Sequence, residues 1–373
     1  RGWSARLVPN SQTLGEEELS YICNMSRSGL ERLSGDLAEN HIPEKLDLGY
    51  HVLGPDGAEV LGKGLAENQG LHLLNLRCNE LSDFGTQAIA DALATQGALR
   101  ELNLTSNAIG DSGARAIGLW LRDCRTIEVL RLRDNHIGPE GGRHLGSALC
   151  ENRSLRRLLL GLNDLGDEGC AGLAEALLKG STLRSLDLGS NGISGEGAEI
   201  LGEALSHEIP LQHLILRVNR IRDEGVRPLA SSLVTNATLV ELDLQGNTLT
   251  DVAVEYLVPA LRENHTLEKV NLEDNFFTDA SAKQILQVLE KNTDLNISEL
   301  KLKKNELTEM MNMQFDIFMR THARELEAKR QKARKEGGSK RQSTKGSSLS
   351  GSPSGSKSRA GSRSRAGSKP PDR

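Results

Sequence analysis

Leucines and asparagines recur with a fixed period along most of the chain. Eight asparagines are spaced 28 residues apart: Asn79, Asn107, Asn135, Asn163, Asn191, Asn219, Asn247 and Asn275. The pattern L-x-x-L-x-L-x-x-N is clearest in LHLLNLRCN (71–79), LRELNLTSN (99–107), LRSLDLGSN (183–191) and LVELDLQGN (239–247). A copy at 43–51 has His51 in place of asparagine, and a copy at 297–305 follows a two-residue insertion. The chain therefore contains ten repeats, numbered here 1 to 10.

Each repeat is predicted to form a short strand followed by a helix. The leucines of a segment such as LNL point to one side of a strand, because strand side chains alternate, and we expect that side to face the core. The strands of successive repeats would pair in parallel, which requires a crossover. The second half of each repeat supplies it, since Ile89 and Leu93, or Leu201 and Leu205, have helical spacing.

The boundaries between strand and helix carry residues that favour helix initiation. The candidate N-cap residues are Ser82, Ser194, Thr250, Thr278, Gly110, Gly138 and Gly166. Acidic residues such as Asp167 and Asp223 lie in the first helical turn, where the helix dipole favours negative charge. An asparagine side chain both donates and accepts, so the column of asparagines is predicted to satisfy backbone groups where the chain leaves each strand.

The tetrapeptide Gly-Asp-Ser-Gly at 110–113 is also found around the nucleophile of some serine proteases. The equivalent positions read Gly-Pro-Glu-Gly at 138–141, Gly-Asp-Glu-Gly at 166–169 and Ser-Gly-Glu-Gly at 194–197. Ser112 is therefore predicted to be a helix-start residue of one repeat, and no catalytic residue is expected. The chain is predicted not to be an enzyme.

The ten copies resemble the ribonuclease-inhibitor-like class of leucine-rich repeat proteins over residues 43–305. The resemblance implies an α/β solenoid, or horseshoe, with parallel strands on the concave face and helices on the convex face. Ribonuclease inhibitors, NOD-like receptors, Ran GTPase-activating proteins, tropomodulin-like actin cappers and several axonemal proteins share this fold and differ in task. This chain lacks the cysteine-rich composition of ribonuclease inhibitors and the acidic tail of many Ran GTPase activators.

Four segments follow from the repeat. Residues 1–42 form an N-terminal segment with a degenerate capping repeat, and residues 43–305 form the solenoid. Residues 306–336 are predicted to be a capping and charged helix, whose apolar stripe comprises Leu307, Met311, Phe315 and Phe318. The alternative is that this stripe binds a partner, since methionine-rich faces adapt to varied surfaces. Residues 337–373 are rich in Ser, Gly, Lys and Arg and are predicted to be disordered.

The charge of the chain is divided unevenly. Residues 337–373 contain nine Lys/Arg and one acid, a net of +8, which leaves −13 for residues 1–336 out of the total of −5. The tail is expected to attract anionic surfaces, although the absence of aromatic residues argues against base stacking. Phosphorylation at Ser343, Ser352 or Ser364 would cancel part of this charge; a plain solvated tail is the alternative.

The remaining composition excludes several kinds of chemistry. Five cysteines without CxxC spacing indicate a reduced, cytoplasmic setting, and no apolar run is long enough to span a membrane. No signal peptide is visible, although the chain begins at Arg1 rather than Met. Three glycosylation sequons, at Asn152, Asn236 and Asn264, occupy one repeat position and are attributed to repetition. Isolated histidines and the absence of a phosphate loop predict no metal and no cofactor.

Outward-facing strand positions supply the candidate binding site. Positions three, five and seven of each repeat face away from the core, and the candidate partner-binding residues are Arg77, Val129, Arg131, Arg133, Arg157, Leu159 and Arg217. The arginines of repeats 4 and 5 would lie on adjacent strands beside apolar residues, a composition typical of interfaces. We therefore expect a protein partner with an acidic surface; the alternative is that these side chains are merely solvated.

The sequence thus predicts a non-enzymatic scaffold that binds a protein partner on its concave face in the cytoplasm. The resemblance suggests a cytoskeletal or axonemal (ciliary) assembly, or innate-immune regulation. The alternative is an activator of a small GTPase, similar to Ran GTPase-activating proteins. A third hypothesis is nucleic-acid binding through the basic tail. No small-molecule substrate and no transmembrane segment are expected.

Overall fold

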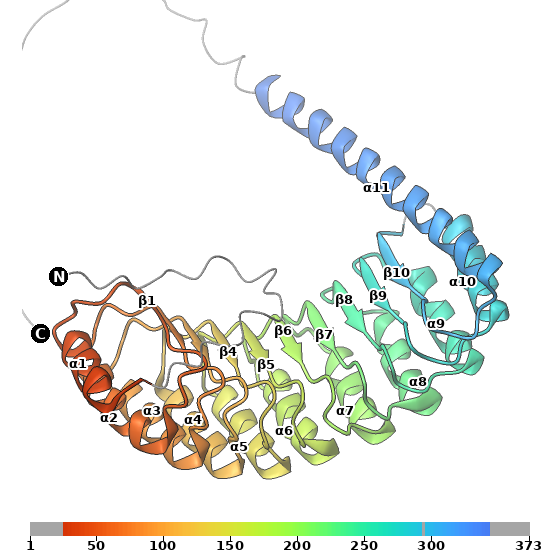
Figure 1. The fold of residues 1–373 in the computed structure, drawn as a ribbon. Helices are drawn as coiled ribbons and strands as arrows, with labels where there is room; N and C mark the ends of the chain where they lie inside the picture. Colours follow the sequence, from red (N-terminus) through yellow and green to blue (C-terminus); the bar gives the residue numbers. More distant parts are fainter. Residues whose placement is uncertain (1–24, 293–294, 344–373) are drawn as a thin grey trace, which may run out of the picture. The chain divides into compact units, whose positions relative to one another are not determined.

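The computed structural model describes residues 25–292 and 295–343, with residues 333–343 described by their backbone alone. The chain divides into two parts, Arg1–Ala323 and Arg324–Arg373. All ten strands belong to the first part (Figure 1). Within it, strands and helices alternate along the chain, as the repeat predicts.

The strands are three residues long and recur once per repeat. They are β1 (Lys45–Asp47), β2 (Leu73–Asn75), β3 (Glu101–Asn103), β4 (Val129–Arg131), β5 (Arg157–Leu159), β6 (Ser185–Asp187), β7 (His213–Ile215), β8 (Glu241–Asp243), β9 (Lys269–Asn271) and β10 (Glu299–Lys301). The helices are α1 (Arg27–Ala38), α2 (Gly54–Glu67), α3 (Ser82–Leu93), α4 (Asp111–Asp123), α5 (Pro139–Leu149), α6 (Gly166–Leu178), α7 (Gly195–Leu205), α8 (Arg222–Leu233), α9 (Asp251–Glu263), α10 (Asp279–Lys291) and α11 (Glu309–Ser343).

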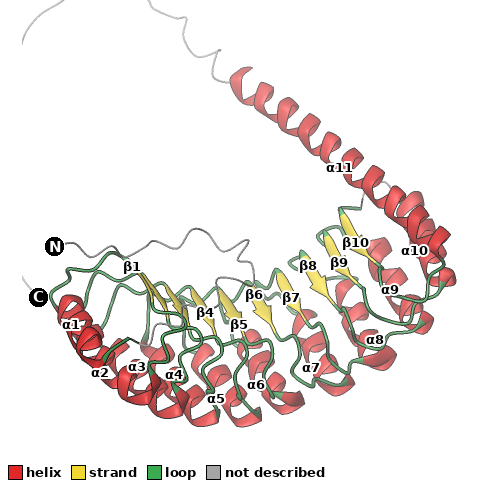
Figure 2. Ribbon diagram, viewed as in Figure 1, coloured by secondary structure: helices red, strands yellow, loops and turns green. Residues whose placement is uncertain are grey.

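The strands form one parallel sheet in the order β1 to β10. Its register follows the repeat, so that Leu102 lies opposite Leu130 and Leu130 opposite Leu158. In the first part of the chain the strands line the inner, concave side and helices α1 to α10 lie on the outer, convex side (Figure 2). The structure therefore confirms the α/β leucine-rich repeat solenoid.

The core consists of aliphatic layers between the sheet and the helices. Leu130, Leu132 and Ile137 of repeat 4 are fully buried, and equivalent residues of the other repeats are buried in the same way. On the helices, the predicted pair Ile89 and Leu93 is also buried. Each layer needs only one repeat's set of leucines and isoleucines, which explains why aromatic residues are so few.

The asparagine column connects successive repeats. The amide of Asn107 donates to the carbonyl of Leu76 in the preceding repeat at 2.9 Å. Its Oδ1 accepts from the backbone N–H of Asn79 at 3.1 Å. Asn107 N–H in turn donates to Asn135 Oδ1 at 2.9 Å. The side chain is 1% exposed, so these bonds replace water for groups that would otherwise be buried without partners. The predicted role of the column is confirmed.

The sequon asparagines form a second amide row where each helix ends. Asn152 Nδ2 donates to Leu121 O at 2.7 Å, and its Oδ1 accepts from Leu155 N–H at 2.8 Å. Asn236 and Asn264 repeat this arrangement. The hydroxyl two residues later, such as that of Ser154, bonds to the same Oδ1. The Asn-x-Ser/Thr spacing is thus a structural motif of the repeat, and these amides are buried.

Two kinds of corner lead into the helices. In the first kind, the residue before the helix is extended and its N–H donates to an aspartate 27 residues earlier; Gly110 donates to Asp83 and Ser194 to Asp167, at 2.7 and 2.8 Å. The cap predictions for Ser194, Thr250 and Thr278 are confirmed, since each side chain accepts a backbone N–H of the first turn. The first-turn aspartates therefore bind the next repeat as well as facing their own helix.

The second kind of corner occurs where that aspartate is missing. Gly54, Ser82, Gly166 and Arg222 adopt positive φ values of 56 to 63°. Their N–H groups donate to the backbone carbonyl of the next column asparagine. The residue 27 positions earlier is Pro55 for Ser82, Pro139 for Gly166 and Gly195 for Arg222. The cap predictions for Ser82 and Gly166 were therefore wrong: both are the first helical residue, without a side-chain cap.

Helices cover both ends of the solenoid core. Helix α1 buries Leu30 and Leu37, in agreement with a degenerate first repeat. At the other end Leu307, Met311 and Phe315 are buried and Phe318 is partly buried, so this stripe covers repeat 10. Lys303 Nζ lies 3.2 Å from Asp316 Oδ2, which ties the last repeat to α11.

Helix α11 continues to Ser343, beyond the predicted boundary at residue 336. The added residues 337–343 include the helix formers Lys340 and Arg341, and also Gly337 and Gly338, each of which costs about 1 kcal/mol in a helix. Residues 344–373, with Ser352 and Ser364, lie outside the described residues. Their predicted disorder and phosphorylation stay predictions.

Candidate functional site

The concave surface presents three rows of side chains, one for each outward strand position. The strand register places Val129 opposite Arg157 and Arg131 opposite Leu159. The predicted cluster is therefore brought together on β4 and β5. Arg133 and Gly161 follow these strands in the third row.

Two arginines of the cluster are already paired with carboxylates. Arg131 forms an ion pair with Glu101 of repeat 3. Arg133 reaches across Gly161, and its Nη1 lies 3.5 Å from Asp187 Oδ2 of repeat 6. Asp187 Oδ1 also accepts the N–H of Gly189 at 3.0 Å. These arginines therefore contribute less free positive charge to the concave surface than their sequence positions imply.

The other members of the cluster differ in exposure. Arg157 is exposed and forms no ion pair with a described residue. Leu159 is half-buried, whereas Val129 is only 7% exposed and offers a partner little surface. The cluster thus consists of one open arginine, two paired arginines and one accessible apolar side chain.

Arg77 and Arg217 each lie along a neighbouring glycine rather than projecting outward. A Cβ at Gly49 would come within 2.9 Å of Arg77 Cγ, and one at Gly189 within 2.8 Å of Arg217 Cγ. The guanidinium carbon of Arg77 also lies 4.8 Å from the ring centroid of Tyr50, a cation–π contact. Both arginines are half-buried and lie outside the β4–β5 cluster.

Exposed apolar side chains flank the cluster at positions not included among the predicted site residues. Leu162 is 42% exposed and Val218 is 51% exposed, each at a left-handed corner directly before a column asparagine. Ile215 on β7 is half-buried and faces the same surface. The sequence could have indicated them, because Leu162 and Val218 precede the column asparagines at a position where most other repeats have a polar or small residue.

Beyond β7 the concave surface is acidic and partly paired. His213 Nδ1 lies 3.0 Å from Glu241 Oε2, and Lys301 Nζ lies 2.9 Å from Glu299 Oε1. Burial raises the pKa of Asp243, and hydrogen bonds from Gln245 and Asn271 oppose the increase. An anionic partner is therefore disfavoured at repeat 8.

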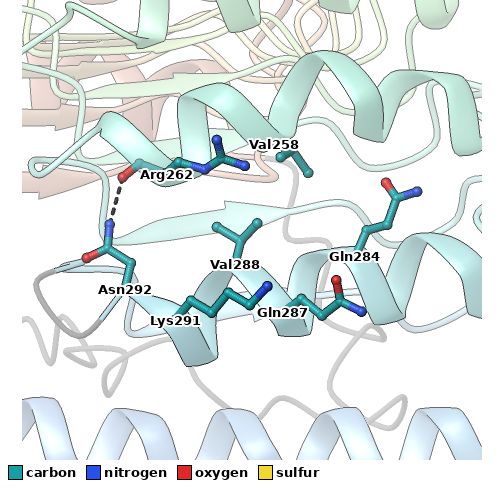
Figure 3. Close-up of a pocket in the computed structure, with 7 residues that line it drawn as sticks. All are labelled: Val258, Arg262, Gln284, Gln287, Val288, Lys291 and Asn292. Carbon is teal, nitrogen blue, oxygen red and sulfur yellow. Dashed lines mark hydrogen bonds between the residues drawn. The ribbon is translucent and has the colours of Figure 1, made fainter.

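Helices α9 and α10 enclose a depression of about 450 Å³ on the convex side. Val258 and Arg262 of α9 face Gln284, Val288 and Lys291 of α10 across it (Figure 3).

The depression between α9 and α10 is caused by a larger residue at one helix position. The position of Val258 is Gly or Ala in α2 to α8, and a Cβ on Gly146 would overlap the backbone of α6. A larger side chain at this position prevents equally close helix packing.

The described residues contain no group of three His, Cys, Asp or Glu side chains that could hold a metal ion. Within the same ranges, no helix is both long and apolar enough to cross a bilayer. Burial raises the pKa of the Cys170 thiol to about 12, so this cysteine is not a nucleophile at neutral pH.

Comparison with known proteins assigns the class. A family model described as "Leucine Rich repeat" matches residues 99–118, 123–146, 151–174, 181–202, 209–230 and 235–258. These matches coincide with the strand and helix repeats of the sheet described above. The chain is a leucine-rich repeat protein.

The comparison with solved structures found matches at low identity. Leiomodin-1 Actin-Binding Site 2 is 18% identical, with a TM-score of 0.40, over 47% of this chain and 96% of that chain. A chain from the crystal structure of the Rad7 and Elc1 complex in yeast is 17% identical, with a TM-score of 0.43, over 76% of this chain and 74% of that chain. No curated protein matches the sequence.

Proposed function

We propose that this protein is a non-enzymatic scaffold that binds a protein partner on the concave surface of repeats 4 to 7. The observation that carries the proposal is the set of apolar side chains left open there: Leu159 and Ile215 on the strands, and Leu162 and Val218 at the adjoining corners. Apolar residues beside arginine form the energetic centres of many protein interfaces.

The predicted arginines take different parts in this proposal. Arg157 is open for a partner carboxylate. Arg131 and Arg133 border the apolar patch and are paired with carboxylates. Arg217 lies against Gly189 at the repeat 7 end of the patch, and Arg77 lies against Gly49 outside it. A cytoplasmic setting in a cytoskeletal, axonemal or innate-immune assembly agrees with the resemblance described above. The alternative, activation of a small GTPase, predicts faster single-turnover GTP hydrolysis.

Affinity purification of the full chain tests the proposal. Leu159→Asp with Ile215→Asp should remove the partners that the wild-type chain captures, because each change places a charge in the apolar patch. The matched control is Leu119→Asp with Leu178→Asp, two side chains of 49 and 44% exposure on α4 and α6. Circular dichroism should be unchanged in both variants. Capture that survives the concave changes, or is lost equally in the control, would refute the concave site.

A further inference from the structure

Five arginines gather where strands β4 to β6 begin. This arginine rim is defined as Arg125, Arg153, Arg156, Arg157 and Arg184. Arg156 N–H donates to Glu128 O, and Arg184 N–H donates to Arg156 O. The backbones that carry the arginines are therefore in direct contact along the sheet edge.

The loops before these strands are joined in the same way. Asn152 Nδ2 and Ser154 Oγ both donate to Cys124 O. Arg153 thus stands beside Arg125, one repeat away. Neighbouring strands are about 4.8 Å apart, so equivalent rim residues lie close together.

The rim arginines have no carboxylate partner among the described residues. Arg125 and Arg153 donate to carbonyls at the ends of α4 and α5, to Arg122 O and Cys150 O, both at 2.9 Å. Arg156 donates to Thr182 O at 3.2 Å. Cations are favoured at helix C-termini, which explains Arg125 and Arg153 structurally. Each guanidinium has five N–H donors, so most donors of the rim stay open.

Arg157 and Arg184 have no such structural role. Both are exposed, and no hydrogen bond or ion pair of either guanidinium is found in the described chain. The nearby Glu128 is bound to Arg100 at 3.2 Å, which leaves Glu151 as the unpaired acid of these loops. The rim is therefore a concentrated positive patch on a body whose net charge is −13.

We propose that the arginine rim binds an acidic protein segment, rich in Asp and Glu. Guanidinium groups match carboxylates in bidentate geometry, and the side chains within the rim include no aromatic ring on which a base could stack. A short acidic segment meets the rim alone, whereas a long polyanion would also meet the acidic remainder of the body.

The rim continues into the proposed concave site. Arg157 and Leu159 share strand β5, so one partner with acidic residues next to apolar ones would contact both. The inference therefore rests on the proposed function and assigns its acidic contact to the edge of the sheet. Arg131 and Arg133, in the middle of the concave surface, are not part of this contact.

A photo-crosslinking experiment tests the rim. The probe is a peptide of ten glutamates with a benzophenone at one end, added to the full chain at low salt and mapped by mass spectrometry. Crosslinks should fall within residues 119–187 and weaken at high salt. In the variant Arg153→Gln/Arg157→Gln/Arg184→Gln their yield should fall about tenfold, from the loss of three exposed charge contacts.

Two controls separate the outcomes. Arg157→Gln/Arg184→Gln removes no hydrogen bond found in the structure and should still reduce the yield severalfold. Arg115→Gln/Arg227→Gln/Arg262→Gln removes the same charge from exposed helix positions and should leave the 119–187 crosslinks unchanged. Crosslinks formed by the basic tail serve as an internal reference in every variant.

Crosslinks confined to the tail, or an equal loss in rim and helix variants, would overturn the rim site. Tighter, rim-dependent binding of a ten-nucleotide single strand would overturn the choice of a protein segment. Either result leaves the concave proposal standing, because that proposal is judged by the Leu159 and Ile215 changes. Partner capture that survives the Leu159 and Ile215 changes, together with rim-dependent peptide crosslinks, would refute the concave proposal and leave the rim site standing.

Discussion

The arginines of the concave surface and those of the rim lie in neighbouring repeats but are held differently. Arg131 and Arg133 are each paired with a carboxylate from another repeat, Glu101 and Asp187. Arg157 and Arg184, at the sheet edge, are exposed and have no ion pair with any residue that the structure describes. A cluster of like charges in the sequence therefore need not be a cluster of available charge. In a solenoid the deciding neighbours are about one or two repeats away.

The largest expected loss of stability follows from substituting Asp187, which contacts both Arg133 and the Gly189 N–H. Asp187→Ala would leave Arg133 without its carboxylate and the Gly189 N–H without its acceptor. We expect the free energy of unfolding to fall by about 2–3 kcal/mol, measured by urea denaturation. Asp187→Asn keeps an acceptor and should cost less. A loss below about 0.5 kcal/mol for the alanine variant would show that the pairing contributes little.

A smaller difference in the free energy of unfolding should distinguish the paired Arg131 from the exposed Arg157. Arg131→Gln should lower the free energy of unfolding by about 1 kcal/mol, because Glu101 loses its partner in a half-buried setting. Arg157→Gln should change it by less than about 0.3 kcal/mol, as expected for an exposed side chain. Urea denaturation of Arg131→Gln, Glu101→Gln and Arg131→Gln/Glu101→Gln provides the coupling energy of the pair, with Arg157→Gln as the reference. Equal losses for Arg131 and Arg157 would contradict the distinction.

The smallest effect concerns Asp243, a buried concave carboxylate without an ion pair in the described chain. Burial raises its pKa, so the folded state retains a proton that the unfolded state releases, and stability falls as the pH rises through this range. Asp243→Asn removes that loss. The difference in urea midpoint between Asp243→Asn and the wild type should increase as the pH is raised from about 3 to about 7. A difference that stays constant, or decreases, would show that Asp243 is not destabilised by burial.

The repeat pattern alone predicts most of the fold. Strand positions, buried leucines and the asparagine column follow from a 28-residue period, because each feature depends on one repeat and its nearest copy. The candidate site is less predictable. That Arg157 and Leu159 share an outward face follows from strand alternation. The reach of Arg133 across Gly161 to Asp187 does not, since it depends on side-chain direction over two repeats.

The helix caps show how a local interpretation fails. Ser82 has the chemistry of an N-cap residue, yet Pro55 occupies the position of the aspartate that would hold it. Its φ is consequently 56°, and its N–H donates to the Asn107 carbonyl instead. The information is present in the sequence, but 27 residues away from the residue it governs.

This dependence has a consequence for building artificial arrays from such proteins. A repeat with aspartate at this helix-start position must be followed by a repeat whose residue before the helix has an extended backbone. A repeat with proline or glycine at that position must be followed by one whose first helical residue can adopt a positive φ. Arg222 follows a repeat of the second kind and adopts a positive φ although it is not a glycine. Repeats of the two kinds are therefore not interchangeable. A chimera assembled by matching leucines alone would have backbone strain at each junction where the two kinds do not match.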